Sequence, residues 1–155
     1  MMNKLLVGAV AGLGATVPMT VAMELMHRNL PEEEQYPLPP RIITMKAAEA
    51  ADAKKEMDEP ERTAATLVSH FAYGAAVGAL YAPLKQKIPL PPILAGSCYG
   101  LAVWAGSYLG LLPALGVLKP ATEHPVRRTA LMIAAHLVWG AALGAATPLI
   151  EEEDA

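Results

Sequence analysis

Four long stretches without a charged residue constrain this chain more than any other feature. A helix needs about 20 apolar residues to cross the hydrocarbon core of a bilayer. Within lipid every backbone polar group must be bonded inside its own segment, so each stretch is predicted to be α-helical. The expected fold is therefore an all-α membrane protein, a single domain over residues 1–155 built as a four-helix transmembrane bundle, with spans at about 5–26, 63–84, 93–118 and 129–150.

The composition agrees with a membrane protein and excludes several other classes. Hydrophobic residues make up 54% of the chain, against about 45–50% in a typical soluble domain. The formal net charge of −3 argues against a nucleic-acid partner, which calls for a basic surface. The single cysteine, Cys98, excludes an internal disulfide framework and a four-cysteine zinc site. The first stretch exceeds the roughly 7–15 apolar residues of a cleaved signal, so we expect it to be retained.

Residues 27–62 form the one sizeable polar segment and are predicted to be a cytoplasmic helical loop. Its first part is rich in proline and acids and indicates an irregular connection. Residues 42–57 are rich in Ala, Lys and Glu and are predicted to be helical. Their apolar positions form a loose stripe, which fits either a helix on the membrane surface or a solvated linker helix. Pro18 and Pro113 lie inside expected spans, where a proline kinks or ends a helix.

The basic residues predict the orientation of the spans. Three of the twelve Lys and Arg residues fall on the side shared by the two termini, and the other nine fall on the opposite side. Cytoplasmic loops carry the excess of Lys and Arg. We therefore expect a multi-pass protein of the bacterial inner membrane with both termini outside.

The second and fourth stretches resemble each other at an offset of 66 residues. Residues 62–84 and 128–150 are identical at nine of 23 aligned positions without a gap. The matches include an Arg-Thr-Ala start and a histidine, His70 in one copy and His136 in the other. This similarity predicts two copies of a two-helix hairpin that run in the same direction, a parallel repeat.

Each stretch also contains small residues at helical spacing. Glycines four residues apart let two helix backbones approach closely, and close packing drives helix association in membranes. The pattern predicts a tight bundle and leaves a contact with a second copy or another membrane protein open. The pairs are Gly8 and Gly12, Gly74 and Gly78, Gly96 and Gly100, and Gly140 and Gly144, with Gly106 and Gly110 as a further pair.

His70 and His136 are the leading candidates for function. Each lies eight residues after an arginine of the repeat, Arg62 or Arg128, and so about 12 Å along its helix. Ionisable side chains at membrane depth are costly and usually functional. Three interpretations stay open: proton transfer or sensing by imidazole, axial ligation of a haem by both histidines, and structural hydrogen bonds between helices. In the first, the two arginines would guard the cytoplasmic entrance.

Four further polar residues are candidates. Glu24 and His27 share a helix face at the end of the first span, but a di-iron site would need a second such motif and two more acids. Glu24 is expected to pair with Arg28 instead. Glu123 and His124 fall in the last short loop. We find no nucleophilic triad and no phosphate-binding loop, and expect no metal site and no enzymatic activity.

Four short stretches together resemble the YagU-like family of small bacterial inner-membrane proteins. The resemblance implies a multi-pass inner-membrane protein, supplies no established reaction, and draws attention to His70, Glu123, His124 and His136. Residues 42–62 depart from the family in length and composition. The stretches that carry it are Pro39-Pro40-Arg41; Ser69-His70-Phe71 with Gly78 and Tyr81; Tyr99-Gly100-Leu101 with Trp104, Pro113 and Gly116; and Glu123-His124 followed by His136-Leu137-Val138-Trp139.

Three functional hypotheses follow. The first is a pH-coupled channel or transporter for protons or a small solute, or an acid-response protein, with His70 and His136 as its titrating pair. The second is a structural or assembly subunit that binds a partner or its own copy through the glycine faces. The third is an electron carrier with haem between the two histidines.

Overall fold

The computed structural model describes residues 3–153, and all of their regular structure is helical. Three helices are long and apolar enough to cross a membrane, namely α1 (Lys4–Arg28), α3 (Glu59–Lys85) and α6 (Val126–Glu153). They correspond to the first, second and fourth expected spans. The remaining elements are the short helix α2 (Pro39–Ala50), the run α4 (Pro92–Ala105), η2 (Gly106–Leu111) and α5 (Leu112–Ala114), and the 3₁₀ turns η1 (Glu32–Glu34) and η3 (Ala121–Glu123).

The third expected span consists of three consecutive helical segments. α4 is followed directly by η2, a π-helical segment, and then by the single turn α5. Pro113 explains this irregularity, because a proline lacks the N–H of an α-helix and its ring crowds the carbonyl four residues earlier, here that of Leu109. A π-helical segment inserted before the proline relieves that conflict. The helix ends at Ala114, earlier than the expected 118, and Gly116 follows with a φ of +64°.

α2 also differs from the expected helix over 42–57. It begins at Pro39 and ends at Ala50, since prolines are well tolerated in the first turn of a helix. Asp52 then takes a φ of +55°, and the chain turns before α3. α3 begins with a capping box, in which Asp58 accepts from the Glu61 N–H and the Glu61 carboxylate accepts from the Asp58 N–H.

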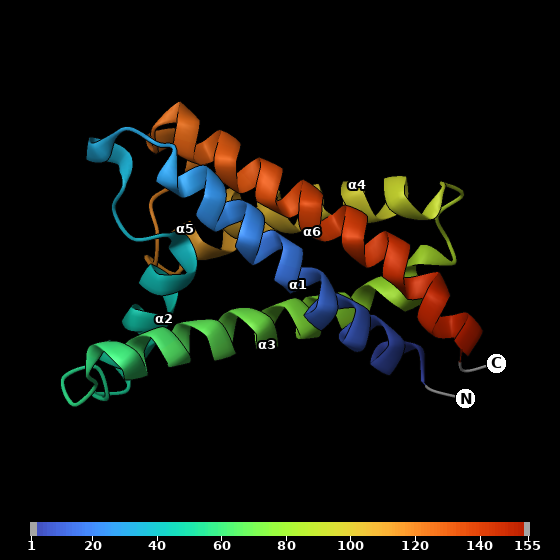
Figure 1. Ribbon diagram of the computed structural model, residues 1–155, viewed down its shortest axis with the longest axis horizontal. Helices are drawn as coiled ribbons and strands as arrows, with labels where there is room; N and C mark the ends of the chain where they lie inside the picture. Colours follow the sequence, from blue (N-terminus) through green and yellow to red (C-terminus); the bar gives the residue numbers. More distant parts are fainter. Residues whose placement is uncertain (1–2, 154–155) are drawn as a thin grey trace.

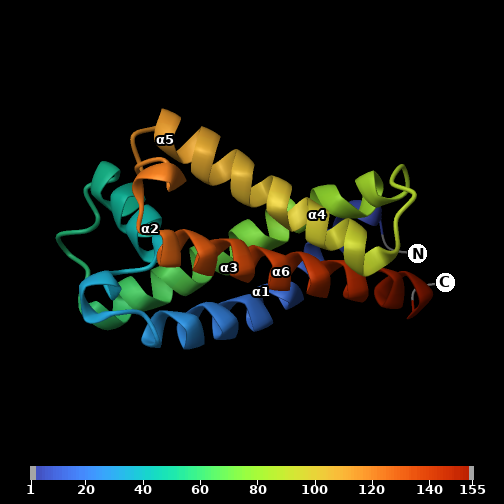
Figure 2. The same cartoon turned by 90° about the horizontal axis from the view of Figure 1, so that it is seen from above.

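The four long helical runs lie side by side in the order α3, α1, α6 and α4, with neighbours antiparallel (Figures 1 and 2). The start of α1 and the end of α6 lie at one end of the bundle. At that end α3 and α4 also meet, where the Tyr81 hydroxyl donates to the Pro92 carbonyl at 3.2 Å. Toward the other end, called here the α2 end, α3 and the α4–α5 run separate, and α2 lies between them (Figure 1).

Glycines join the helices in two pairs. Gly12 of α1 faces Gly74 and Gly78 of α3 so closely that a side chain on any of these three residues would collide with the opposite helix. Gly96 of α4 faces Gly140 and Gly144 of α6 in the same way. Gly8 and Gly100 complete the two contacts. The glycine pairs of these four helices thus form contacts within this chain, whereas Gly106 and Gly110 have open space beside them.

The outer surface of the bundle is apolar and its interior is lined by small residues. On α1 the exposed side chains include Leu6, Val10, Leu13, Val17 and Val21, which follow one face of the helix. Half of the eight buried residues of α1 are alanine or glycine. A soluble protein rarely exposes a continuous apolar patch of this kind. The pattern indicates helices that face lipid on the outside.

Candidate functional site

A cavity of about 300 Å³ lies between the helices, toward the α2 end. All four helical runs and α2 contribute to its walls. The walls are mostly apolar, and their polar atoms come from a few hydroxyl and imidazole groups. No Asp, Glu, Lys or Arg is among its lining residues. Such a cavity, apolar with a few convergent polar groups, is the usual form of a small-molecule site.

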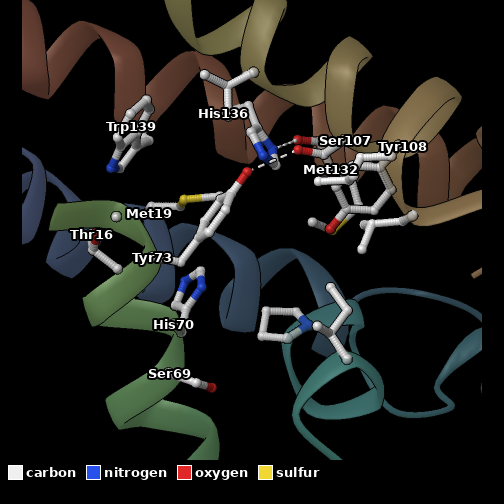
Figure 3. A pocket seen from close by; sticks show the side chains of 16 residues that line it. Thr16, Met19, Ser69, His70, Tyr73, Ser107, Tyr108, Met132, His136 and Trp139 are labelled. Atoms are coloured by element: carbon white, nitrogen blue, oxygen red, sulfur yellow. Dashed lines mark hydrogen bonds between the residues drawn. The ribbon is translucent and has the colours of Figure 1, made fainter. Parts of the chain in front are cut away.

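His70 and His136 both face this cavity, His70 from α3 and His136 from α6 (Figure 3). His136 is only 6% exposed, and its Nδ1 lies 2.7 Å from the Met132 carbonyl oxygen. The Nε2 of His70 is buried without a hydrogen-bond partner among the described residues. The structure thus brings together the two histidines that the repeat singles out.

Tyr73 lies between the two histidines (Figure 3). Its hydroxyl is 3.0 Å from the Ser107 hydroxyl of η2, and this hydrogen bond crosses the gap between α3 and η2. The tyrosine ring therefore occupies the space that a porphyrin would need between two axial histidines. The arrangement gives no support to paired haem ligation by His70 and His136.

The π-helical segment supplies the wall opposite α3. It directs Ser107, Tyr108 and Leu111 into the cavity, and the Tyr108 ring meets the His136 ring edge-on at a centroid distance of 5.7 Å. π-helical segments inside α-helices are frequent at functional sites. Neither Ser107 nor Tyr108 was among the candidate functional residues that the sequence suggested. Pro113 was the sequence signal for this segment, since a proline inside a span predicts an irregular turn before it.

The cavity is closed at both ends along the helix axes. Away from α2 it ends at a cluster of aromatic rings, in which Tyr99 lies between Tyr81 and Trp139, tilted against both, at centroid distances of 5.2 and 6.1 Å. The Trp139 Nε1–H also donates to the Gly12 carbonyl at 3.2 Å. At the α2 end, Pro40 and Ile43 of α2 form part of the wall.

Side-chain contacts hold α2 over the cavity. The Thr44 hydroxyl lies 2.5 Å from the Ser69 hydroxyl of α3, and the Lys46 ammonium donates to the Gly116 carbonyl beyond α5 at 2.9 Å. α2 therefore connects the two helical runs that separate at this end. Met45 of α2 is buried and Ile43 lines the cavity, whereas Ala47 and Ala50 of the predicted apolar stripe are exposed.

Glu24, His27, Glu123 and His124 lie outside the cavity. Glu24 accepts from the Arg28 guanidinium at 3.0 Å on an exposed face, the pairing expected from their spacing. The rings of His27 and His124 each donate from Nε2 to a loop carbonyl, at 3.1 and 3.2 Å. Glu123 ends the η3 turn. Among the described residues no three His, Cys, Asp or Glu side chains group as metal ligands would.

Arg128 anchors the loop before α2. The residue is 5% exposed, and its guanidinium donates to the carbonyls of Glu34, Tyr36 and Pro37. It also lies 3.6 Å from the centroid of the Tyr36 ring, a cation–π contact. Arg62, which aligns with Arg128 at the 66-residue offset, donates to the Lys54 carbonyl at 3.2 Å. The structure engages both arginines in loop contacts, a role that the sequence did not suggest.

The helices, the lipid-like outer surface and the internal cavity define this chain as a helical membrane protein. A family model described as "Protein of unknown function (DUF1440)" matches residues 29–145, about three quarters of the chain. The protein belongs to that family. No curated protein and no solved structure matches it.

Proposed function

We propose that this protein is a non-enzymatic, multi-pass protein of the bacterial inner membrane that moves protons or a small solute through its cavity in a pH-coupled manner. The observation that carries the proposal is the convergence of His70 and His136 on one cavity at membrane depth. Imidazole is the side chain whose ordinary titration falls between pH 5 and 8. The solute is expected to be small and largely apolar, because the walls are.

Two features support four spans with both termini outside. The run from Pro92 to Ala114 is helical without a break and would reach about 34 Å at 1.5 Å per residue, enough for the hydrocarbon core. The start of α1 and the end of α6 lie together (Figure 2), as an even number of spans requires. The α2 end, where nine of the twelve basic residues gather, would be cytoplasmic.

The glycine contacts support the parallel repeat. Gly12 meets Gly74 and Gly78, and Gly96 meets Gly140 and Gly144, which are the residues 66 positions later in the second copy. In a duplicated protein, α1 with α3 would be one hairpin and α4 with α6 the other. The likeness to YagU-like inner-membrane proteins belongs to the same proposal.

Proton flux into proteoliposomes tests the proposal. The purified protein is reconstituted around a trapped pH-sensitive dye, and flux is followed at external pH 5 and 7.5. We expect flux above that of empty vesicles, and its loss when His70 and His136 are both replaced by Ala. His27→Ala is the matched control, because His27 lies outside the cavity and should leave flux unchanged. No flux at either pH, or equal flux in both variants, would refute a histidine-dependent path.

A structural or assembly subunit is the second candidate. The glycine pairs that the sequence offered to a partner are used inside the chain, but Gly106 and Gly110 remain exposed on the outer side of η2. A second copy or another membrane protein would pack there. The oligomeric state in detergent, compared between the unaltered protein and Gly110→Leu, separates this candidate from the first.

A further inference from the structure

We propose that the occupant of the cavity is a neutral, lipid-soluble molecule with one hydroxyl group, a phenol or an alcohol on an apolar body, which enters sideways from the bilayer. This inference rests on the proposed function and names the class of its solute. Three observations carry it: the hydrogen-bonding state of His136, the hydroxyl pair beside it, and the position of the exposed lining residues.

His136 presents a hydrogen-bond acceptor to the cavity. A carbonyl oxygen only accepts, so the Nδ1 that lies 2.7 Å from the Met132 carbonyl carries the hydrogen. In a neutral imidazole the other nitrogen, Nε2, then has a free lone pair. A ligand that satisfies this nitrogen must donate a hydrogen bond. Ketones, ethers and carboxylates offer no donor.

The hydroxyls of Tyr73 and Ser107 present a donor close by. The two groups hold two hydrogens, and the bond between them at 3.0 Å uses one. The second hydrogen is free to donate to a ligand. In Figure 3 the Tyr73 hydroxyl points toward the side of the cavity that His136 lines. An acceptor next to a donor is the complement of a single hydroxyl group, which gives one hydrogen bond and receives another.

The open side of the cavity faces lipid. Three of its lining residues, Ser69 and Tyr73 of α3 and Leu111 of η2, are also exposed. Ser69 and Tyr73 lie about 10–17 Å along α3 from Arg62 at 1.5 Å per residue, and so at the depth of the hydrocarbon. α2 and the aromatic cluster close the two ends. The ligand therefore reaches the cavity through the gap between α3 and η2.

Proton and ligand compete for one atom. A proton on Nε2 of His136 turns the acceptor into a donor and removes the partner of the ligand hydroxyl. The titratable groups that face His136 are His70 and Tyr73 from α3 and Tyr108 from η2. The lining residues from α1 and α2 do not titrate, and among the described residues that line the cavity there is no Asp, Glu, Lys or Arg. Ligand binding would thus release a proton from protein that carries one on His136.

A matched pair of probes tests the hydroxyl. 4-Butylphenol and its methyl ether share one body and an acceptor oxygen, but only the phenol donates. Binding to the protein in nanodiscs is followed by tryptophan fluorescence in a Trp104→Phe background, where Trp139 in the cavity wall is the remaining tryptophan. We expect the phenol to bind about tenfold more tightly than the ether at equal membrane concentration, the effect of one buried hydrogen bond.

Variants locate the effect. His136→Phe should bring phenol affinity down to that of the ether, whereas His27→Phe should leave the ratio unchanged. Phenol affinity should also fall between pH 6 and pH 3.5, a range in which a phenol does not titrate. Tyr73→Phe provides a second test of the hydroxyl pair if His136→Phe does not fold.

The outcomes separate this inference from the proposed function. Equal affinity for phenol and ether, or tighter binding of 4-butylbenzoate than of the phenol, overturns the hydroxyl class and leaves a solute cavity in place. A phenol preference that survives His136→Phe also overturns it. If none of the three probes changes Trp139 fluorescence, both the inference and the solute-binding function are refuted.

Discussion

Replacing Gly12 by Ala should loosen the bundle, and the structure gives the size of the effect. An added methyl would collide with the Gly74 carbonyl and lie 2.8 Å from the Gly78 Cα. Ordinary contacts between carbons are about 3.5–4.0 Å, so α1 and α3 must separate by about 1 Å. Overpacking of this kind costs about 1–3 kcal/mol. The helices stay formed when a membrane bundle comes apart, so the better helix propensity of alanine offsets little of this cost.

Gly14→Ala is the matched control, because nothing lies within 4 Å of a side chain added there. Unfolding in mixed micelles of increasing sodium dodecyl sulfate content, followed by tryptophan fluorescence, measures both variants. Trp139 is a suitable reporter, since its indole N–H donates to the Gly12 carbonyl. The expected result is a loss of about 1–3 kcal/mol for Gly12→Ala and almost none for Gly14→Ala. Equal losses in the two variants would show that α1 and α3 do not pack through these glycines.

Two further predictions concern the α2 end. Arg128→Met removes the donors to three loop carbonyls, so hydrogen exchange of the amides in residues 34–38 should become faster and the protein should lose about 2 kcal/mol of stability or more. The exposed Arg127→Met should change neither. Equal exchange rates in the two variants would contradict the anchoring role of Arg128. Pro113→Ala restores an N–H, so η2 should revert to α-helix and carry Ser107 out of line with Tyr73 by roughly 100°. Tyr73→Phe should then lower stability less in that background than in the unaltered protein. An equal loss of stability in both backgrounds would show that Pro113 does not position Ser107 for its bond with Tyr73.

The sequence predicted the long helices and the placement of the two histidines better than it predicted the cavity. Gaps between charges mark α1, α3 and α6, because a charge inside lipid is so costly. Equal spacing from Arg62 and Arg128 placed His70 and His136 at one depth. Their convergence on a shared cavity depends on the lateral order of the helices, which is set by which faces pack together, and helix spacing alone does not contain that order.

The π-helical segment and the position of α2 could not be predicted from the sequence, for a different reason. The change from α to π geometry shifts each side chain around the helix, so Tyr108 points to the cavity only once that change is known. α2 covers the bundle through single contacts such as those of Thr44 and Lys46. Such contacts join residues far apart in the chain and leave no periodic signal in the sequence.

The glycine contacts also determine where this molecule can move. Between α1 and α3, and between α4 and α6, the glycine backbones lie directly on the backbone of the opposite helix, and these close contacts leave the helices little room to slide. The space between α3 and η2 is different, since it is filled by side chains and crossed by the bond between Tyr73 and Ser107. Rotation of one tyrosine side chain would widen that gap while both glycine contacts stay intact. The bundle has a rigid side and a compliant side, and the cavity opens on the compliant one.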